Sequence, residues 1–267
     1  MFGFFLKKNF CDGWDNIMNL IVPNLVLMVM IFFGFISVRA IVNLELAFSI
    51  PLSFLLIILF IGLCMVLIMS FAENAAKIAN FEDVKIRWFF TEIPNVFKDG
   101  FLYGLLMGLL VVAGIIGIPA YLSMGTLYGL VLAIVLFCFE VVFILSLQWF
   151  IPLRALLHDD FKKCFKKSFI IFFDNTGFSI LMFLYNGVLC AMSFLMLTLI
   201  PSGAGIVLSL TNALRLRLYK YDWLDQHPDL KNPKDRKRIP WDKLIAEDEE
   251  AVGHRTFKSF FMPWKED

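Results

Sequence analysis

The sequence predicts an all-α integral membrane protein, and three observations carry this prediction. Apolar residues make up 60% of the 267 residues, charged residues make up only 18%, and the mean hydropathy is +0.77. So little polar side-chain surface cannot coat a water-soluble globule of this size. Long uncharged runs recur along the chain, and each can cross a hydrocarbon core that takes about 20 helical residues. The basic residues cluster between those runs, as they do between the spans of membrane proteins.

The uncharged runs resolve into six predicted transmembrane helices, paired as three helical hairpins. Two runs have single length, and two have about double length with a breaker near the middle. The breakers are Pro119 followed by Gly125, and Pro201 followed by Gly203. Proline lacks the amide hydrogen that continues a helix, so each double run is expected to reverse direction there. The predicted spans lie near 17–38, 50–71, 101–118, 126–150, 176–199 and 203–218.

The distribution of Lys and Arg predicts the orientation in the membrane. Basic residues accumulate in the cytoplasmic loops of membrane proteins, so both termini are expected in the cytoplasm. The first span is long and lacks a small-residue cleavage pattern, and we expect it to be retained. Every Lys and Arg except Arg39 falls in segments that six spans would place on one face, namely 1–16, 72–100, 151–175 and 215 onward.

Two regions are expected, a six-helix transmembrane domain at 1–218 and a cytoplasmic tail at 219–267. The tail divides into an extended, proline-punctuated linker at 219–240 and a helical or docking segment at 241–267. Aromatic side chains recur at helical spacing in the second part, beyond what a solvated chain end requires. We predict that they dock on a partner subunit, with the lipid surface as the alternative; they are Trp241, Phe257, Phe260, Phe261 and Trp264.

One short signal precedes three of the predicted spans: phenylalanine, any residue, aspartate, then glycine or asparagine. It reads FCDG, FKDG and FFDN, and its acids are Asp12, Asp99 and Asp174. An aspartate at a helix start accepts hydrogen bonds from free backbone amides and suits the positive end of the helix dipole. The pattern therefore predicts three helix N-caps where the chain leaves the cytoplasm. The alternative is a cytoplasmic site assembled from the three acids.

The loop before the fifth span is predicted to be an amphipathic elbow that lies on the membrane. It reads FKKCFKKSFIIFF, with phenylalanines recurring at spacings of four and three. A face of four lysines attracts anionic lipid, and a phosphate or an acidic partner is the alternative ligand. A second elbow is expected at 81–97. The lipid-facing lysines of the first elbow are Lys162, Lys163, Lys166 and Lys167.

The second elbow also carries a family resemblance. Residues 86–106, IRWFFTEIPNVFKDGFLYGLL, lead into the third span. Together with three cytoplasm-anchored hairpins, this pattern resembles the YesL-like family of small bacterial integral membrane proteins, over residues 1 to about 220. The resemblance implies a multi-pass protein of the bacterial cytoplasmic (inner) membrane, associated with carbohydrate uptake systems. Residues 35–48 read FISVRAIVNLELAF where the family carries a Pro-Thr-Gly-type signature, and no site residue is carried over.

Polar residues inside the predicted spans are few, and Glu140 is the only acid well within one. A charge there is costly unless it is neutralised or paired. Gln148 follows two helical turns later on about the same face, and Asn24 and Asn186 could join the two from other spans. One interpretation is a proton- or solute-binding cluster, which transporters place near the middle of the membrane. The other is a protonated glutamate that bridges two helices through one hydrogen bond.

The sequence carries no catalytic motif, so an enzyme is not expected. It has no glycine-rich phosphate loop, no zinc-type His-x-x-x-His and no Gly-x-Ser-x-Gly elbow. Its five cysteines lack any Cys-x-x-Cys spacing, so neither a metal nor a cofactor is predicted. The basic run at 234–238 is expected to meet anionic lipid rather than nucleic acid.

Together these features favour a non-catalytic accessory or scaffold subunit of a bacterial membrane complex, with an ABC-type carbohydrate uptake system as the complex that the resemblance implies. Its expected partners are membrane lipids and other membrane or cytoplasmic subunits. The alternative is a stand-alone secondary transporter or permease that uses the polar cluster around Glu140. A membrane-embedded lipid enzyme would need a reactive cluster that the sequence does not show.

Overall fold

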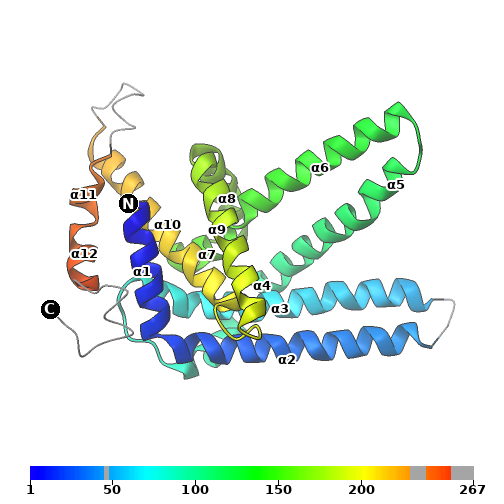
Figure 1. Ribbon diagram of the computed structural model, residues 1–267, viewed down its shortest axis with the longest axis horizontal. Helices are drawn as coiled ribbons and strands as arrows, with labels where there is room; N and C mark the ends of the chain where they lie inside the picture. Colours follow the sequence, from blue (N-terminus) through cyan, green and yellow to red (C-terminus); the bar gives the residue numbers. More distant parts are fainter. Residues whose placement is uncertain (45–47, 229–238, 254–267) are drawn as a thin grey trace.

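The computed structural model describes residues 1–44, 48–228 and 239–253 (Figure 1). Throughout these ranges the regular secondary structure is helical, with no strand. The elements are α1 (Phe2–Asp15), α2 (Ile17–Val42), α3 (Ser49–Ala79), α4 (Ile86–Val112), the π-helical turn η1 (Ala113–Gly117), α5 (Ile118–Leu122), α6 (Leu127–Leu147), α7 (Phe150–Leu157), α8 (Phe161–Asp174), α9 (Thr176–Leu195), α10 (Ser202–Gln226), α11 (Trp241–Leu244) and α12 (Ala246–Val252).

Five helical stretches in the described residues are long and apolar enough to cross a membrane. Two of them contain more than one element. One runs from α4 through η1 into α5, and the other runs from α6 into α7. The chain is therefore an all-helical, multi-pass membrane protein. The five stretches are Ile17–Val42, Ser49–Ala79, Ile86–Leu122, Leu127–Leu157 and Thr176–Leu195.

The sixth predicted span, 203–218, lies in α10, which is not among these five stretches. The protein itself buries the apolar first half of α10, including Val207 and Leu208. The second half carries charged side chains and runs on to Gln226, well into the segment predicted to be an extended linker. These charged side chains lower the hydropathy of α10, so the sixth span stays a prediction.

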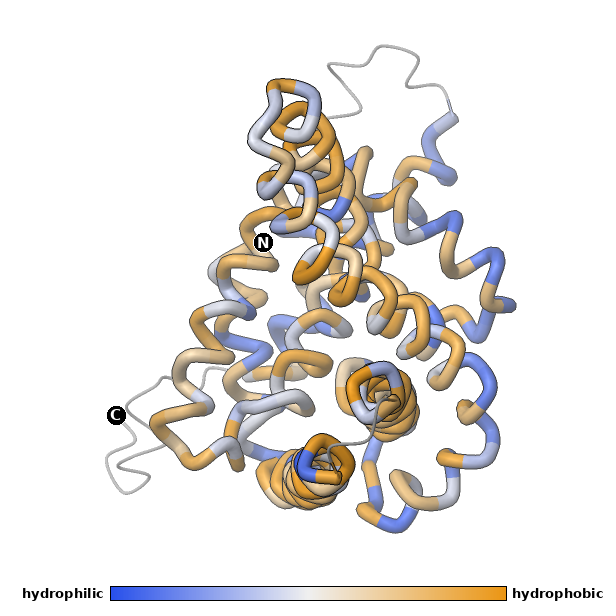
Figure 2. Tube along the Cα trace, turned by 90° about the vertical axis from the view of Figure 1, so that its right-hand side faces the viewer, coloured by the Kyte–Doolittle hydropathy of each residue, from blue (hydrophilic) through white to orange (hydrophobic). Residues whose placement is uncertain are grey.

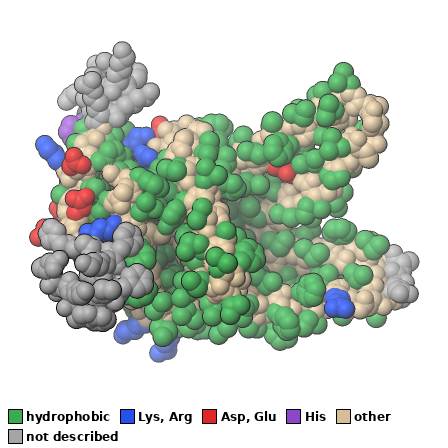
Figure 3. Space-filling model, viewed as in Figure 1, with side chains coloured by type: hydrophobic (Ala, Val, Ile, Leu, Met, Phe, Trp, Pro, Cys, Tyr) green, Lys and Arg blue, Asp and Glu red, His purple; other side chains and the backbone are tan. Residues whose placement is uncertain are grey.

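Two helical hairpins project from one end of the molecule as arms (Figure 1). The first arm pairs α2 with α3. The second is formed by the outer part of α4 with η1 and α5, and by α6, which returns after a turn at 123–126. Gly125 has a φ of 60° in that turn, and the Thr126 hydroxyl caps α6 by accepting a hydrogen bond from the Gly129 amide. Figure 3 shows hydrophobic side chains over both arms, which stand apart at their outer ends.

The arms diverge from a seam where α3 and α4 are in backbone contact. A Cβ atom added at Gly104 would lie 2.5 Å from the Cα of Gly62, and one added at Gly100 would lie 2.8 Å from the Cα of Val66. Glycines at this spacing let two helices approach more closely than any side chain would allow. Further along, α5 packs on α6 and η1 instead of on α3.

The other end of the molecule, which we call the base, holds α1, α7, α8 and α10 to α12 (Figure 1). Its interior is aromatic and aliphatic, and Trp149, Phe150 and Leu153 are fully buried there. The α9–α10 turn lies in the lower middle of Figure 1, beside α2, whereas the turns of the two arms lie at the right. In the view along the arms in Figure 2, apolar residues occupy most of the circumference of their helices, which is typical of helices surrounded by lipid.

Candidate functional site

The three aspartates of the repeated signal do not cap helix N-termini, so that prediction is wrong. Asp12 lies near the C-terminal end of α1, Asp99 lies in the middle of α4, and Asp174 is the last residue of α8. The segments that lead into the spans are themselves helical, so the amides after each aspartate are already within reach of backbone carbonyls. Each aspartate instead forms a charged contact with a different partner: Asp99 and Asp174 each link two helices, and Asp12 pairs within α1.

Asp99 connects α4 to α7. Its Oδ2 atom lies 2.8 Å from the Nε atom of Arg154, and both side chains are mostly buried. Glu73 of α3 lies nearby, with its Oε2 atom 3.7 Å from the Nδ1 atom of His158. These contacts hold α3, α4 and the end of α7 together at the edge of the base.

Asp12 forms a buried pair with Lys8 inside α1, with 2.9 Å between Oδ2 and Nζ. The Lys8 ammonium is fully buried and lies 3.6 Å from the centre of the Phe81 ring. Burial lowers the pKa of Lys8 and raises the pKa of Asp12, because each charge has lost water. Phe81 has a φ of 60°, a left-handed conformation that is strained for an aromatic residue, and Arg215 lies 5.4 Å from the same ring.

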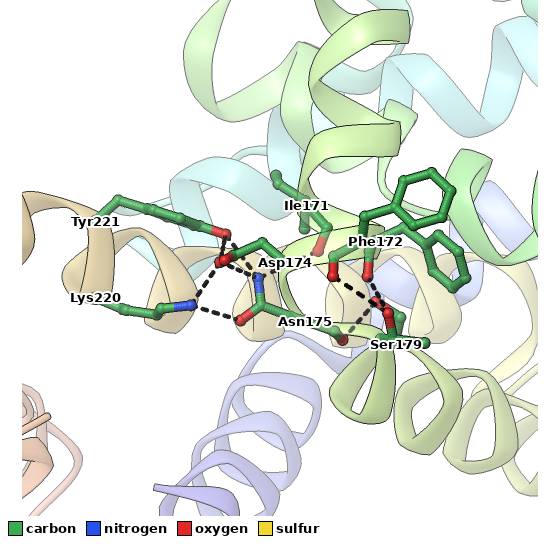
Figure 4. A network of polar contacts seen from close by, with 9 residues as sticks. Ile171, Phe172, Asp174, Asn175, Ser179, Lys220 and Tyr221 are labelled. Atoms are coloured by element: carbon green, nitrogen blue, oxygen red, sulfur yellow. Dashed lines mark hydrogen bonds and ion pairs between the residues drawn. The ribbon is translucent and has the colours of Figure 1, made fainter. Parts of the chain in front are cut away.

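Asp174 joins α8 to α10 (Figure 4). Lys220 Nζ lies 2.6 Å from its Oδ2 atom, and the Tyr221 hydroxyl donates to that atom at 2.7 Å. Asn175 lies between them and donates to the Tyr221 hydroxyl at 2.6 Å. Burial alone would raise the pKa of Asp174, but the hydrogen bonds from Lys220 and Tyr221 outweigh it, and the pKa falls below its ordinary value of 3.8. The separate partners of the three acids argue against one shared site.

The structure does not bring the intramembrane polar residues into one cluster. Gln148 donates to the carbonyls of Leu145 and Ser179, at 2.8 and 3.0 Å. Asn24 closes the α9–α10 turn by donating to the carbonyls of Leu199 and Pro201 and accepting from the Ala204 amide.

Asn186 lies in α9, and its Oδ1 atom is buried without a hydrogen-bond partner among the described residues. These side chains were chosen from the sequence because they are polar residues within apolar runs. Nothing in a single sequence shows which of them share a neighbour.

Glu140 lies alone in the second arm, against η1. A Cβ atom added at Gly114 would lie 2.5 Å from the Oε2 atom of Glu140, so glycine at this position makes room for the carboxyl group. The Oε1 atom is buried and has no hydrogen-bond partner in the part of the chain that the structure describes. Single π-helical turns are rare and are frequent at functional sites. Sequence reasoning singled out Glu140 but missed Gly114, since only the fold brings the two together.

The first part of the tail packs on the protein's own base, whereas the prediction was that the segment 241–267 docks on a partner subunit or on the lipid surface. Asp248 of α12 forms an ion pair with Arg215 of α10, with 3.1 Å between Oδ1 and Nη2 and a second contact between Oδ2 and Nη1. The Tyr219 hydroxyl donates to Asp248 at 3.2 Å, and Lys7 of α1 donates to the Gly253 carbonyl at 2.7 Å.

Apolar side chains complete this contact. Ile245 and Val252 are buried in the core of the base, and the Arg217 guanidinium lies 5.5 Å from the centre of the Trp241 ring. The spacing of Ile245, Asp248 and Val252 on one helical face is the signal that could have indicated this docking. The other residues predicted to dock, Phe257, Phe260, Phe261 and Trp264, lie outside the described residues.

The amphipathic elbow at 161–172 is part of α8, and three of its phenylalanines contact aromatic rings of α6 and α7. Phe165 and Phe169 pack on Phe143 of α6, with ring centres 6.5 and 5.0 Å apart, and Phe161 packs on Phe150 of α7. The second elbow has no boundary of its own, because it continues into α4 without a break. The spacing of the phenylalanines correctly predicted an amphipathic helix at α8. Other helices of the protein, however, cover much of the apolar face that was predicted to contact lipid.

No group of three or more His, Cys, Asp or Glu residues in the described ranges is placed to hold a metal ion. No protein-family model, curated protein or solved structure matches this chain.

Proposed function

We propose that the protein is a non-catalytic accessory or scaffold subunit of a bacterial membrane complex, embedded in the cytoplasmic membrane with its base in the cytoplasm. The resemblance to the YesL-like family implies an ABC-type carbohydrate uptake system as that complex. The observation that carries the proposal is the divergence of the two arms. Both arms are apolar, and their outer parts have no neighbour within the described chain on the sides that face each other (Figures 1 and 3).

The second arm exposes an unusual amount of apolar surface on helices that lie within the membrane. Leu127, Tyr128 and Val135 are 78%, 73% and 60% exposed. Helices in a bilayer gain little from hydrophobic burial against each other, and they associate through close packing and polar contacts. A wedge between two diverging hairpins offers two packing surfaces to one incoming helix. This geometry suits a partner's transmembrane helix better than a closed solute pathway.

Photo-crosslinking in the native membrane tests this proposal. A photoreactive amino acid at Ile115, which is 68% exposed, should give a discrete adduct with another protein, because η1 belongs to the helix of the second arm that lies nearer to α3 (Figure 1). A second one at Ile170 is the matched control, because it is also exposed, at 52%, but lies on α8 in the base. Purification in mild detergent followed by mass spectrometry should recover the same partner at constant stoichiometry. Adducts with lipid alone at Ile115, together with no stoichiometric partner, would reject the scaffold function.

The second candidate function is a proton-coupled secondary transporter. It is favoured by one observation, the Glu140 carboxyl that contacts a π-helical turn at Gly114 and has a buried oxygen without a partner. Carbodiimides react with protonated carboxyl groups in apolar surroundings, so this function predicts labelling at Glu140 that Glu140→Gln abolishes. It also predicts proton uptake into liposomes, under an imposed gradient, that depends on Glu140. Equal proton uptake by the native protein and Glu140→Gln would reject it.

A further inference from the structure

A groove runs between α4 and α8, and its lining is almost entirely apolar. We call it the α4–α8 groove. Its volume is about 470 Å³. Its walls are four leucines of α4 and two phenylalanines of α8, namely Leu102, Leu105, Leu106, Leu109, Phe161 and Phe165. The leucines lie in a helical stretch that is apolar and long enough to cross the membrane, so hydrocarbon from the bilayer can reach the groove.

One cationic side chain, Lys162, also lines the α4–α8 groove. Two of the other three lysines at the start of α8 contact acids of the preceding turn. Lys163 lies 3.9 Å from Asp160, and Lys167 forms an ion pair with Asp159. Lys162 is exposed and forms no ion pair with any residue that the structure describes. The four lysines look equivalent in the sequence, but the fold gives them different neighbours.

The lining defines the chemistry of the occupant. Four leucines and two phenylalanines offer no hydrogen bonds, so an extended peptide in this groove would leave its backbone amides and carbonyls unsatisfied. An inorganic anion would bind to Lys162 but would leave the apolar wall without a contact. A long acyl chain that carries an anionic head group satisfies both the wall and the cation.

We propose that the α4–α8 groove is a binding site for one anionic phospholipid, with an acyl chain against the leucines of α4 and the phosphate at Lys162. The site does not depend on which function the protein has, because a scaffold subunit and a transporter would both meet the same bilayer. It also assigns different roles within the basic face of α8. Lys162 binds lipid, whereas Lys163 and Lys167 hold the α7–α8 turn through Asp160 and Asp159.

Native mass spectrometry of the full chain tests the site. The purified protein is titrated with phosphatidylglycerol and, in parallel, with phosphatidylcholine that has the same acyl chains. We expect the native protein to retain phosphatidylglycerol more strongly than phosphatidylcholine. Lys162→Gln should weaken the retention of phosphatidylglycerol about fivefold, which corresponds to the loss of one basic residue near an anionic head group. Lys163→Gln is the matched control on the neighbouring position and should leave the retention unchanged.

A second variant tests the apolar wall independently of charge. Leu105→Trp should fill the groove and weaken the retention of both lipids, while gel filtration shows that the protein remains intact. Excess inorganic phosphate should not displace phosphatidylglycerol, and displacement would indicate a simple anion site. Equal retention by Lys162→Gln and Lys163→Gln, or equal retention of the two lipids by the native protein, would overturn the proposal.

Discussion

Replacing Asp248 by alanine is expected to release α11 and α12 from the base while the rest of the structure stays folded. The side chains of Asp248 and Arg215 are only 6% and 15% exposed, so the substitution would leave the Arg215 guanidinium largely buried without its carboxylate. Removing one partner of a buried ion pair costs about 3–5 kcal/mol. Arg215 keeps some access to water and a 2.8 Å hydrogen bond to Asn80, which places the cost near 3 kcal/mol. That value corresponds to a roughly hundredfold larger opening equilibrium for the tail helices.

Hydrogen exchange followed by mass spectrometry measures this opening directly. Amides in 241–253 of Asp248→Ala should exchange about a hundred times faster than in the native protein, and amides of α3 and α4 should be unchanged. Glu249→Ala is the matched control, because Glu249 is the next residue of α12 and is exposed. If the two variants exchange at the same rate, the ion pair does not hold the tail and the reasoning from burial fails.

Three further predictions follow from particular contacts. Gly104→Ala should destabilise the protein by about 1–3 kcal/mol in denaturant unfolding, because its Cβ would lie 2.5 Å from the Cα of Gly62, whereas Gly177→Ala meets no atom within 4 Å and should cost much less. Gly114→Ala should destabilise the native protein in thermal melts but should cost less in a Glu140→Ala background, since the carboxyl group that it would strike is gone; additive effects would contradict the contact. Asp174 has a pKa held below 3.8, so its contribution to stability is present above pH 3.8 and is lost as the pH falls through the folded-state pKa. Thermal melts at decreasing pH should therefore show a smaller loss of stability for Asp174→Asn than for the native protein, and parallel curves would contradict this.

The fold class could be predicted from the sequence because a membrane helix makes all its backbone hydrogen bonds within itself. Each span therefore shows as one continuous run of apolar residues. The helices α2, α3, α6 and α9 were located in this way, and the turn after Pro119 reverses the chain near Gly125. The sixth span stays a prediction, because α10 combines an apolar half that the protein buries with a half that carries charged side chains. The boundary of α4 was missed. The elbow and the span share one helical periodicity, so no residue marks where the first becomes the second.

The candidate sites were less predictable, since each depends on residues far apart in the chain. Glu140 and Lys162 were recognisable as charged groups in unusual surroundings. Their neighbours, Gly114 and the leucines of α4, carry no chemical signal of their own. The three aspartates failed as caps because the signal of phenylalanine, aspartate and glycine specifies a cap only where a helix begins, and Asp99 has helix on both sides. Ion pairs such as Arg215 with Asp248 require the fold to be known first.

The base is assembled from segments that lie far apart in the chain, and this constrains the order of events during synthesis. Lys8 is fully buried in α1, yet the elements that pack around α1 include α10 and α12, which are synthesised after both arms. Chains generally fold as they emerge, with the N-terminal parts first. The two arms can therefore insert into the membrane while the Lys8 ammonium of α1 is still exposed to water. A chain that ends before Ser202 would carry the membrane helices of both arms but would lack the helices that bury Lys8.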